Sequence, residues 1–131
     1  MAKYAYPAIF TKEDNGYSVT FPDIDGCFTC GDTLPEAMEM AEDALCLSLY
    51  DREEDDDPIP SPSDIRAVQS HTGDIVSLIF CDTLEYRKHY DSRTVKKTLS
   101  LPNWLNTLSE RAGLNFSTVL EEALKAKLDL S

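Results

Sequence analysis

The sequence has 131 residues, with 24 Asp or Glu against 12 Lys or Arg and a formal net charge of −12. A chain of this length forms one domain, or one small domain and a module too short to fold alone. Such acidity excludes a protein that coats nucleic acid over its whole surface. No apolar run approaches the ~18 residues of a membrane helix and the N-terminus lacks a signal-peptide pattern, so we expect a cytoplasmic protein with reduced cysteines.

The charge is unevenly distributed along the chain. Residues 1–85 contain 19 Asp or Glu and 4 Lys or Arg, whereas residues 86–131 contain 5 Asp or Glu and 8 Lys or Arg. A split of this kind indicates an acidic part joined to a locally basic reader of nucleic acid. The alternative is that the acidic half is simply well solvated.

The first half is predicted to begin with a β-hairpin. An apolar stretch leads to Asn15-Gly16, which is typical of a two-residue turn because both residues tolerate positive φ. After the turn Tyr17, Val19 and Phe21 alternate with polar residues. This period of two predicts a strand with one buried face.

A helix and a returning strand are predicted next. Thr33 and Glu36 form a capping box for a helix from about Pro35 to Leu49. The acidic run of residues 51–64 ends it, because its prolines cannot continue a helix, and this run is either a mobile solvated loop or a surface for a partner. Residues 74–82 are apolar nearly throughout, which predicts a central strand. The first half is therefore an α+β unit with a small antiparallel sheet.

Residues 85–93 are polar and without periodicity, so we predict a linker between a domain of residues 1–84 and a module of residues 94–131. The module begins with a strand at residues 95–101, where polar and apolar residues alternate. Two helices follow.

The first helix is predicted to start at Pro102 and to end at Gly113, and Asn115 caps the second. One strand and two helices bury too little surface to be stable alone. Two copies solve this by pairing their strands into an antiparallel ribbon.

This order of elements resembles the ribbon-helix-helix DNA-binding domain, whose ribbon enters the major groove. The resemblance implies that Lys96, Thr98 and Ser100 contact base edges. It also implies a phosphate contact at the start of the second helix, near Asn115 and Ser117. The alternation places Lys97 on the helix-facing side, so we expect it either to snorkel to a phosphate or to mark a local slip of the register. The alternative is that the module only dimerises and that its lysines protect an edge strand from aggregation.

The first half carries a G-Y-x-V-x-F-P-D strand followed by G-C and by G-D-T before a helix. From Tyr6 to about Leu49 it thereby resembles the HicB-type antitoxin domain, which looks like a partial ribonuclease H fold; a ribbon-helix-helix tail is one arrangement known in that family. The resemblance implies a bacterial toxin–antitoxin pair. The first domain would silence a HicA-type toxin, a basic RNase that cuts mRNA. The second would bind operator DNA and repress transcription, and we expect a homodimer through the C-terminal ribbon, or a tetramer.

An acidic antitoxin suits a basic toxin, since opposite fields favour association. We therefore expect the toxin to contact acids of the first domain, namely Asp23, Asp25, Asp51, Glu53, Glu54 and Asp55. The alternative function is a stand-alone ribbon-helix-helix regulator whose first domain senses a ligand or another protein.

The sequence predicts a protein that is not an enzyme and that needs no cofactor or metal. Its acids form no spaced set that would converge on metal ions, and His71 and His89 are isolated. Cys27 and Cys30 have a C-x-x-C spacing but no second ligand pair for zinc. A redox centre requires its cysteines at the N-terminus of a helix, and here the predicted helix begins only after Cys30. We expect Cys27 to fill a small apolar space. A metal-dependent nuclease is the remaining class to be tested.

Overall fold

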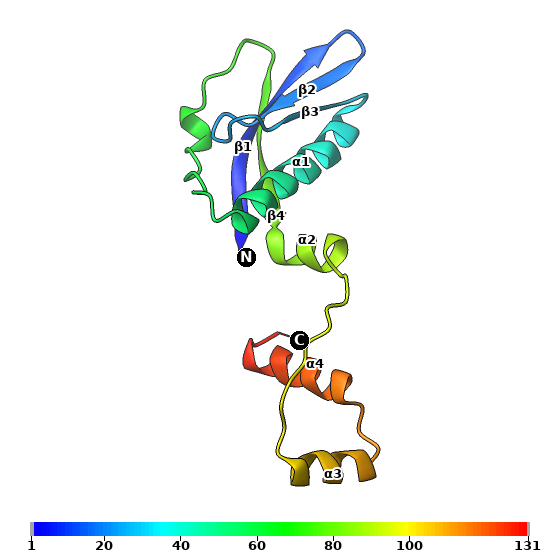
Figure 1. The fold of residues 1–131 in the computed structure, drawn as a ribbon. Coiled ribbons are helices and arrows are strands. Elements are labelled where there is room, and N and C mark those ends of the chain that lie inside the picture. The colour runs from blue at the N-terminus through cyan, green and yellow to red at the C-terminus, as the bar shows by residue number, and fades with distance from the viewer. Residues whose placement is uncertain (1, 131) are drawn as a thin grey trace. The chain divides into compact units, whose positions relative to one another are not determined.

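A computed structural model describes residues 2–130, which form two compact units divided between Arg93 and Thr94 (Figure 1). The first unit is a four-stranded antiparallel sheet with helices. The second unit contains two helices. The α+β class expected for the first unit is confirmed.

The sheet has the strand order β3-β2-β1-β4, and every neighbouring pair is antiparallel. Its strands are β1 (Lys3–Glu13), β2 (Gly16–Thr20), β3 (Phe28–Gly31) and β4 (Ile75–Asp82). β1 lies between β2 and β4, so the first and last strands of the sheet are hydrogen-bonded to each other. The expected likeness to ribonuclease H is not decided by this pairing and stays a prediction.

The predicted hairpin is present, but its turn lies one residue earlier than the sequence indicates. Glu13 pairs with Gly16, so Asp14 and Asn15 form the two-residue loop. Gly16 has φ +146°, and a Cβ at this position would lie 2.4 Å from the carbonyl oxygen of Gly31. The glycine is therefore required by the neighbouring strand as well as by the turn.

The strand at residues 74–82 is wrongly predicted as central. β4 pairs only with β1 and forms an edge of the sheet. Only one face of this apolar strand is buried. Ile79 and Cys81 lie on the buried face, whereas Leu78 and Phe80 are about half exposed. An apolar run indicates burial on both faces, and here one face is left without a covering layer.

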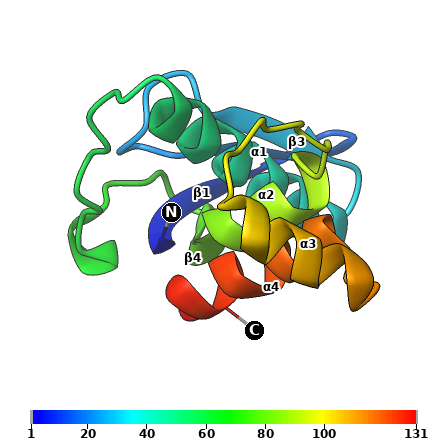
Figure 2. The ribbon, with the colours of Figure 1, turned by 60° about the horizontal axis from the view of Figure 1, so that its bottom comes forward.

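Helix α1 (Leu34–Glu54) packs across one face of the sheet and contacts β2, β3 and β4 (Figures 1 and 2). Thr33 caps it as predicted, accepting a hydrogen bond at 3.2 Å from the Glu36 N–H. The buried residues of α1 join side chains of β1, β2 and β4 in one apolar core. These helix residues are Ala37, Ala41, Leu45, Cys46 and Leu49.

The close approach of β3 to α1 requires Gly31, because a Cβ there would lie 2.4 Å from the backbone nitrogen of Ala37. The helix is also longer than predicted, since it continues through the first acids of the run to Glu54. The rest of that run is tied to the unit at defined points. The Tyr6 hydroxyl donates to the Pro60 carbonyl, and Asp23 accepts hydrogen bonds from Ser63.

The predicted linker is also corrected. Helix α2 (Thr83–Tyr90) occupies most of it and packs against α1. Asp82 caps α2, accepting hydrogen bonds from the N–H groups of Leu84 at 3.0 Å and Glu85 at 3.3 Å. The segment with neither helix nor strand starts at Asp91 and continues to residue 102.

The second unit contains α3 (Asn103–Arg111) and α4 (Phe116–Lys127), close to the predicted positions. Gly113 follows α3 with φ +71°, as a C-terminal glycine requires. Asn115 caps α4, accepting a hydrogen bond at 3.1 Å from the Thr118 N–H. Among the described residues of this unit, none is buried.

Candidate nucleic-acid and protein interfaces

The four predicted DNA-contacting residues of the strand, Lys96, Thr98, Ser100 and Lys97, all lie in the extended segment before α3 and are exposed. The segment is not a strand in the single chain. A β-strand needs a hydrogen-bonded neighbour, and none of the described residues supplies one. The pairing expected for a ribbon-helix-helix domain would come from a second copy.

The start of α4 has the features of an anion site. The Asn115 side-chain oxygen already accepts a hydrogen bond, whereas the N–H groups of Phe116 and Ser117 lie in the first helical turn, where intrahelical acceptors are missing. The positive end of the helix dipole lies there too. The Asn115 side chain therefore caps the helix, and the backbone N–H of Ser117 lies where the phosphate contact was predicted.

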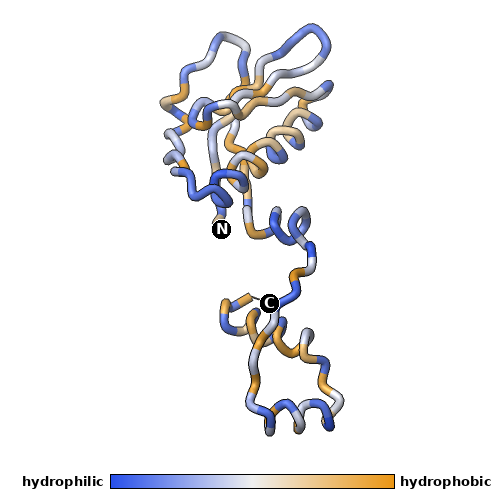
Figure 3. Tube along the Cα trace, viewed as in Figure 1, coloured by the Kyte–Doolittle hydropathy of each residue, from blue (hydrophilic) through white to orange (hydrophobic). Residues whose placement is uncertain are grey.

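Apolar side chains of the second unit are left uncovered. Figure 3 shows hydrophobic positions recurring along both of its helices. Trp104 and Leu108 of α3 are 65% and 59% exposed, and Leu124 of α4 is 52% exposed. Isolated apolar residues on a surface are ordinary, but a unit in which none of residues 94–130 is buried indicates a missing partner.

The acids predicted to contact a toxin lie in two stretches of the first unit, one with Asp23 and Asp25 and one at the end of α1. Asp23 is half-buried and occupied by Ser63, whereas Asp25 is exposed. Asp51 is exposed near the end of α1 and Asp55 is its C-terminal cap residue. Their contact with a toxin stays a prediction.

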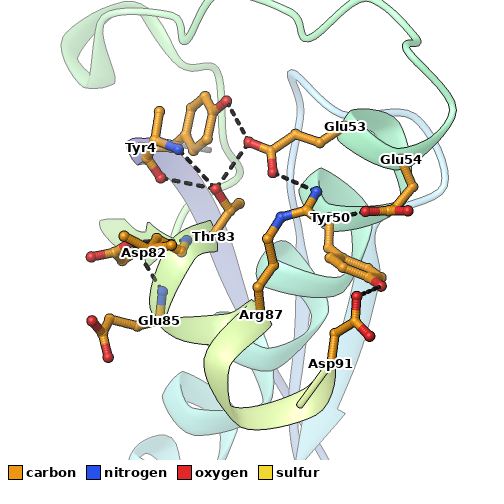
Figure 4. A network of polar contacts seen from close by, with 11 residues as sticks. Tyr4, Tyr50, Glu53, Glu54, Asp82, Thr83, Glu85, Arg87 and Asp91 are labelled. Carbon is orange, nitrogen blue, oxygen red and sulfur yellow. Dashed lines mark hydrogen bonds and ion pairs between the residues drawn. The ribbon is translucent and has the colours of Figure 1, made fainter. Parts of the chain in front are cut away.

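The expectation that Glu53 contacts a toxin is corrected, because its side chain is only 8% exposed and belongs to an internal network (Figure 4). Its carboxylate accepts hydrogen bonds from the Tyr4 hydroxyl at 3.1 Å and the Thr83 hydroxyl at 2.9 Å. Arg87 donates to it at 3.1 Å and also pairs with Glu54. Glu53 therefore cannot contribute a free charge to a partner, and Glu54 is shared between solvent and Arg87.

The network links the start of β1, the end of α1 and helix α2. Burial alone would raise the pKa of Glu53, but hydrogen bonds, including those from Thr83, Arg87 and Tyr4, outweigh burial and lower that pKa. Burial and the contact with Glu53 raise the pKa of Tyr4. The Arg87 guanidinium also lies 4.7 Å from the ring centre of Tyr50. Charge and stacking together hold α2 on α1.

Helix α2 was not predicted from the sequence, although a local signal was present. Asp82 followed three positions later by Glu85 has the spacing of a helix cap, and α2 places Arg87 where it reaches both Glu53 and Glu54. The low apolar content of residues 83–90 concealed the helix, because its attachment to α1 is largely polar and aromatic.

The cysteines behave as packing residues. Cys27 is buried as predicted, whereas Cys30 is exposed on β3, and Cys46 and Cys81 are buried. Burial raises the pKa of the Cys27 thiol, and the contact with Cys46 together with burial raises the pKa of Cys81. Within residues 2–130, His, Cys, Asp and Glu side chains nowhere gather in threes in a way that could hold a metal ion. Nor does any helix there have the length and apolarity needed to cross a bilayer.

Comparison with known proteins gives consistent matches. The model of a family described as HicB-like antitoxin of bacterial toxin–antitoxin system matches residues 6–122. Antitoxin HicB 2 of Photorhabdus laumondii subsp. laumondii is 45% identical over 58 residues, which cover 44% of this chain and 42% of that protein. This chain thus matches less than half the length of its curated relatives.

Solved structures extend the likeness over nearly the whole chain. A chain from a toxin–antitoxin complex of Streptococcus pneumoniae is 30% identical with a TM-score of 0.62, and the match covers 95% of this chain and 99% of that one. The crystal structure of antitoxin HicB3 is 27% identical with a TM-score of 0.53, covering 98% and 99%.

Proposed function

This chain belongs to the HicB-like antitoxins of bacterial toxin–antitoxin systems, and on that premise we propose that it neutralises a HicA-type, mRNA-cleaving toxin and represses its own operon. The observation that carries the proposal is the family match over residues 6–122, which takes in most of both units. The protein would act in the cytoplasm, by binding and not by catalysis.

Toxin binding is assigned to the first unit because of its charge. Residues 2–93 contain 20 Asp or Glu and 7 Lys or Arg, a net charge of −13. A toxin that binds RNA must be basic where the RNA lies, so an acidic partner is attracted to that surface and competes with the phosphates for it.

Operator binding is assigned to the second unit. Its two helices follow an extended segment carrying two lysines, and its apolar side chains have no cover in one chain. A second copy would pair the two segments into a ribbon and bury both apolar faces, giving a homodimer that can associate further into a tetramer. Lys96, Thr98 and Ser100 would then face the base edges, and Lys97 and the start of α4 the phosphates.

The division of labour is tested by truncation. Residues 1–93 should rescue growth of cells that express the neighbouring basic toxin, yet should no longer shift DNA from upstream of the operon in a gel. Failure of this fragment to rescue growth, when the full chain does so, would show that toxin binding needs the second unit.

The ribbon is tested by single substitutions in the full chain. We expect Lys96→Ala, Thr98→Ala and Ser100→Ala each to weaken operator binding by about 1–3 kcal/mol and to leave growth rescue intact. Lys125→Ala is the matched control, because Lys125 pairs with Glu121 on α4 at 2.9 Å. Operator binding that equals the control in all three variants would refute the ribbon assignment.

A further inference from the structure

A hollow of about 540 Å³ lies where α1, β4 and α2 meet in the first unit. This volume is in the range of sites that hold a side chain or a small ligand. None of the acids expected to contact a toxin lines it. The hollow is therefore a surface feature separate from the acidic run of residues 51–64.

One wall of the hollow is apolar and aromatic, and it is open to solvent. Phe80 of β4 is 54% exposed and Tyr90 of α2 is 62% exposed, although both are large rings. The rings of Tyr86 and Tyr90 contact each other, with their centres 4.5 Å apart and their planes tilted by 35°. Met40 of α1 adds a polarisable thioether opposite α2.

The rim of the hollow is acidic. Glu39, Glu42 and Asp43 come from exposed positions of α1, and Asp82 and Glu85 come from the start of α2. Neither lysine nor arginine is among the described residues that line it.

Two of the five carboxylates have local partners, since Asp82 caps α2 and Glu85 pairs with Lys88 at 3.1 Å. The charges of α1 still act inside the hollow. The pKa of Tyr86 is raised by burial and then by the charge of Asp43. Aromatic faces beside such carboxylates suit one chemistry, that of a guanidinium or an ammonium group. The ring faces attract a cation, and the carboxylates accept its N–H bonds.

The apolar surface continues from the hollow along β4. Met38 and Leu78 are about half exposed and line an adjoining depression that shares Glu39, Glu42 and Phe80 with the hollow. Because β4 is an edge strand, this side of the unit ends in uncovered backbone and apolar side chains. A partner that covers it must be apolar along β4 and cationic at the hollow.

We propose that the hollow between α1, β4 and α2 receives an arginine or lysine side chain of the toxin, whose neighbouring apolar residues cover Leu78 and Phe80. The identity of the partner rests on the proposed function, whereas the cation preference of the hollow does not. The acidic walls exclude nucleic acid as the occupant, because phosphates would be repelled.

The cation preference is tested on the full chain without the toxin. N-acetyl-arginine methylamide is titrated against protein with labelled methionine methyl and tyrosine ring groups, followed by NMR. We expect the signals of Met40, Tyr86 and Tyr90 to shift with arginine and to stay in place with the neutral citrulline analogue. The hairpin hollow, which is lined by Asp14, Tyr17 and Asp32, is the internal control. Shifts at Tyr17 as large as at Tyr86, or no shift at Tyr86, would overturn the proposal.

The partner is tested with variants of equal charge. Glu39→Gln, Glu42→Gln and Asp43→Asn together should weaken binding of the inactivated toxin by about tenfold or more. The control combines Glu13→Gln, Asp14→Asn and Asp32→Asn, exposed acids around the hairpin hollow that remove the same charge, and it should change binding less than about twofold.

The outcomes separate the two proposals. If the wild-type chain does not bind the toxin, the proposed function fails, and the arginine titration still decides the nature of the hollow. If the wild type binds and the two triple variants weaken binding equally, the hollow is not the contact and the antitoxin function stands. Tyr90→Ala, at an exposed position on α2, repeats the test without altering charge and should weaken binding about threefold.

Discussion

Replacing Arg87 by methionine should destabilise the first unit far more than an ordinary surface substitution. The guanidinium pairs with Glu53, whose side chain is 8% exposed, and with Glu54, which is 44% exposed, and it lies over Tyr50. Methionine keeps the aliphatic stem and removes all three interactions.

The magnitude follows from their burial. The bond to Glu53 is charged and largely shielded, which is worth about 1.5–3 kcal/mol. The half-exposed pair with Glu54 and the contact with Tyr50 add at most about 1 kcal/mol each. Glu53 keeps its bonds from Tyr4 and Thr83, so the full cost of a stranded charge does not arise. We expect a loss of about 2–3 kcal/mol.

The sequence itself supplies the assay. All six tyrosines lie in the first unit and the one tryptophan, Trp104, lies in the second. Urea unfolding followed by tyrosine absorbance therefore reports on residues 2–93, and tryptophan fluorescence reports on the rest. With a slope of about 1 kcal/mol/M, the tyrosine midpoint should fall by about 2–3 M urea, and the tryptophan transition should stay in place.

Arg66→Met is the matched control, because Arg66 pairs with Asp64 at 2.6 Å but the two side chains are 87% and 48% exposed. Such a pair contributes about 0–1 kcal/mol. In the Arg87→Met background, Glu53→Gln should cost less stability than it does in the wild-type chain, because the bond between Glu53 and Arg87 is already absent. The reasoning is refuted if Arg87→Met costs no more than the control.

Three further predictions follow from the same structure. Folding lowers the pKa of Glu53, so the stability that Glu53 contributes is complete above its unfolded pKa near 4.5 and is lost as pH falls through the folded pKa. The urea midpoint of the tyrosine transition should therefore decrease when the pH is lowered below about 4.5, and Glu53→Gln should make that decrease smaller. Gly31→Ala should cost about 2–3 kcal/mol, since its Cβ would meet the Ala37 backbone, whereas Gly26→Ala, in open space at φ +75°, should cost about 1 kcal/mol in calorimetry. Leu124→Asp on the uncovered face of α4 should weaken self-association about 100-fold in light scattering and leave the tyrosine transition unchanged; a stable dimer would contradict the proposed interface.

Features fixed by local chemistry could be predicted from the sequence. Thr33 and Asn115 cap helices through their own side chains, and Gly113 supplies a left-handed conformation, so each acts within a few residues. The burial of Val19 and Phe21 could be predicted because apolar and polar residues alternate along this strand. None of these depends on how distant segments meet.

The rest depends on tertiary placement, which a local pattern does not contain. The apolar run of β4 does not reveal that one of its neighbours is missing. Glu53 belongs to the same acidic run as Asp55, and only the meeting of α1 with α2 turns it inward. The hollow beside Phe80 and Tyr90 joins three elements, so no motif marks it.

The pairing of β1 with β4 also determines when the first unit can fold during synthesis. Lys3 lies opposite Asp82 in the register of the pair, so β1, which is synthesised before β4, must wait for β4 before this edge can pair. At about 5–20 residues per second, this delay is roughly 4–16 s. During that time one edge of β1 is open, and a nascent chain stopped before Ile75 cannot complete its sheet. The four-stranded sheet of the first unit is therefore completed only after β4 has been synthesised.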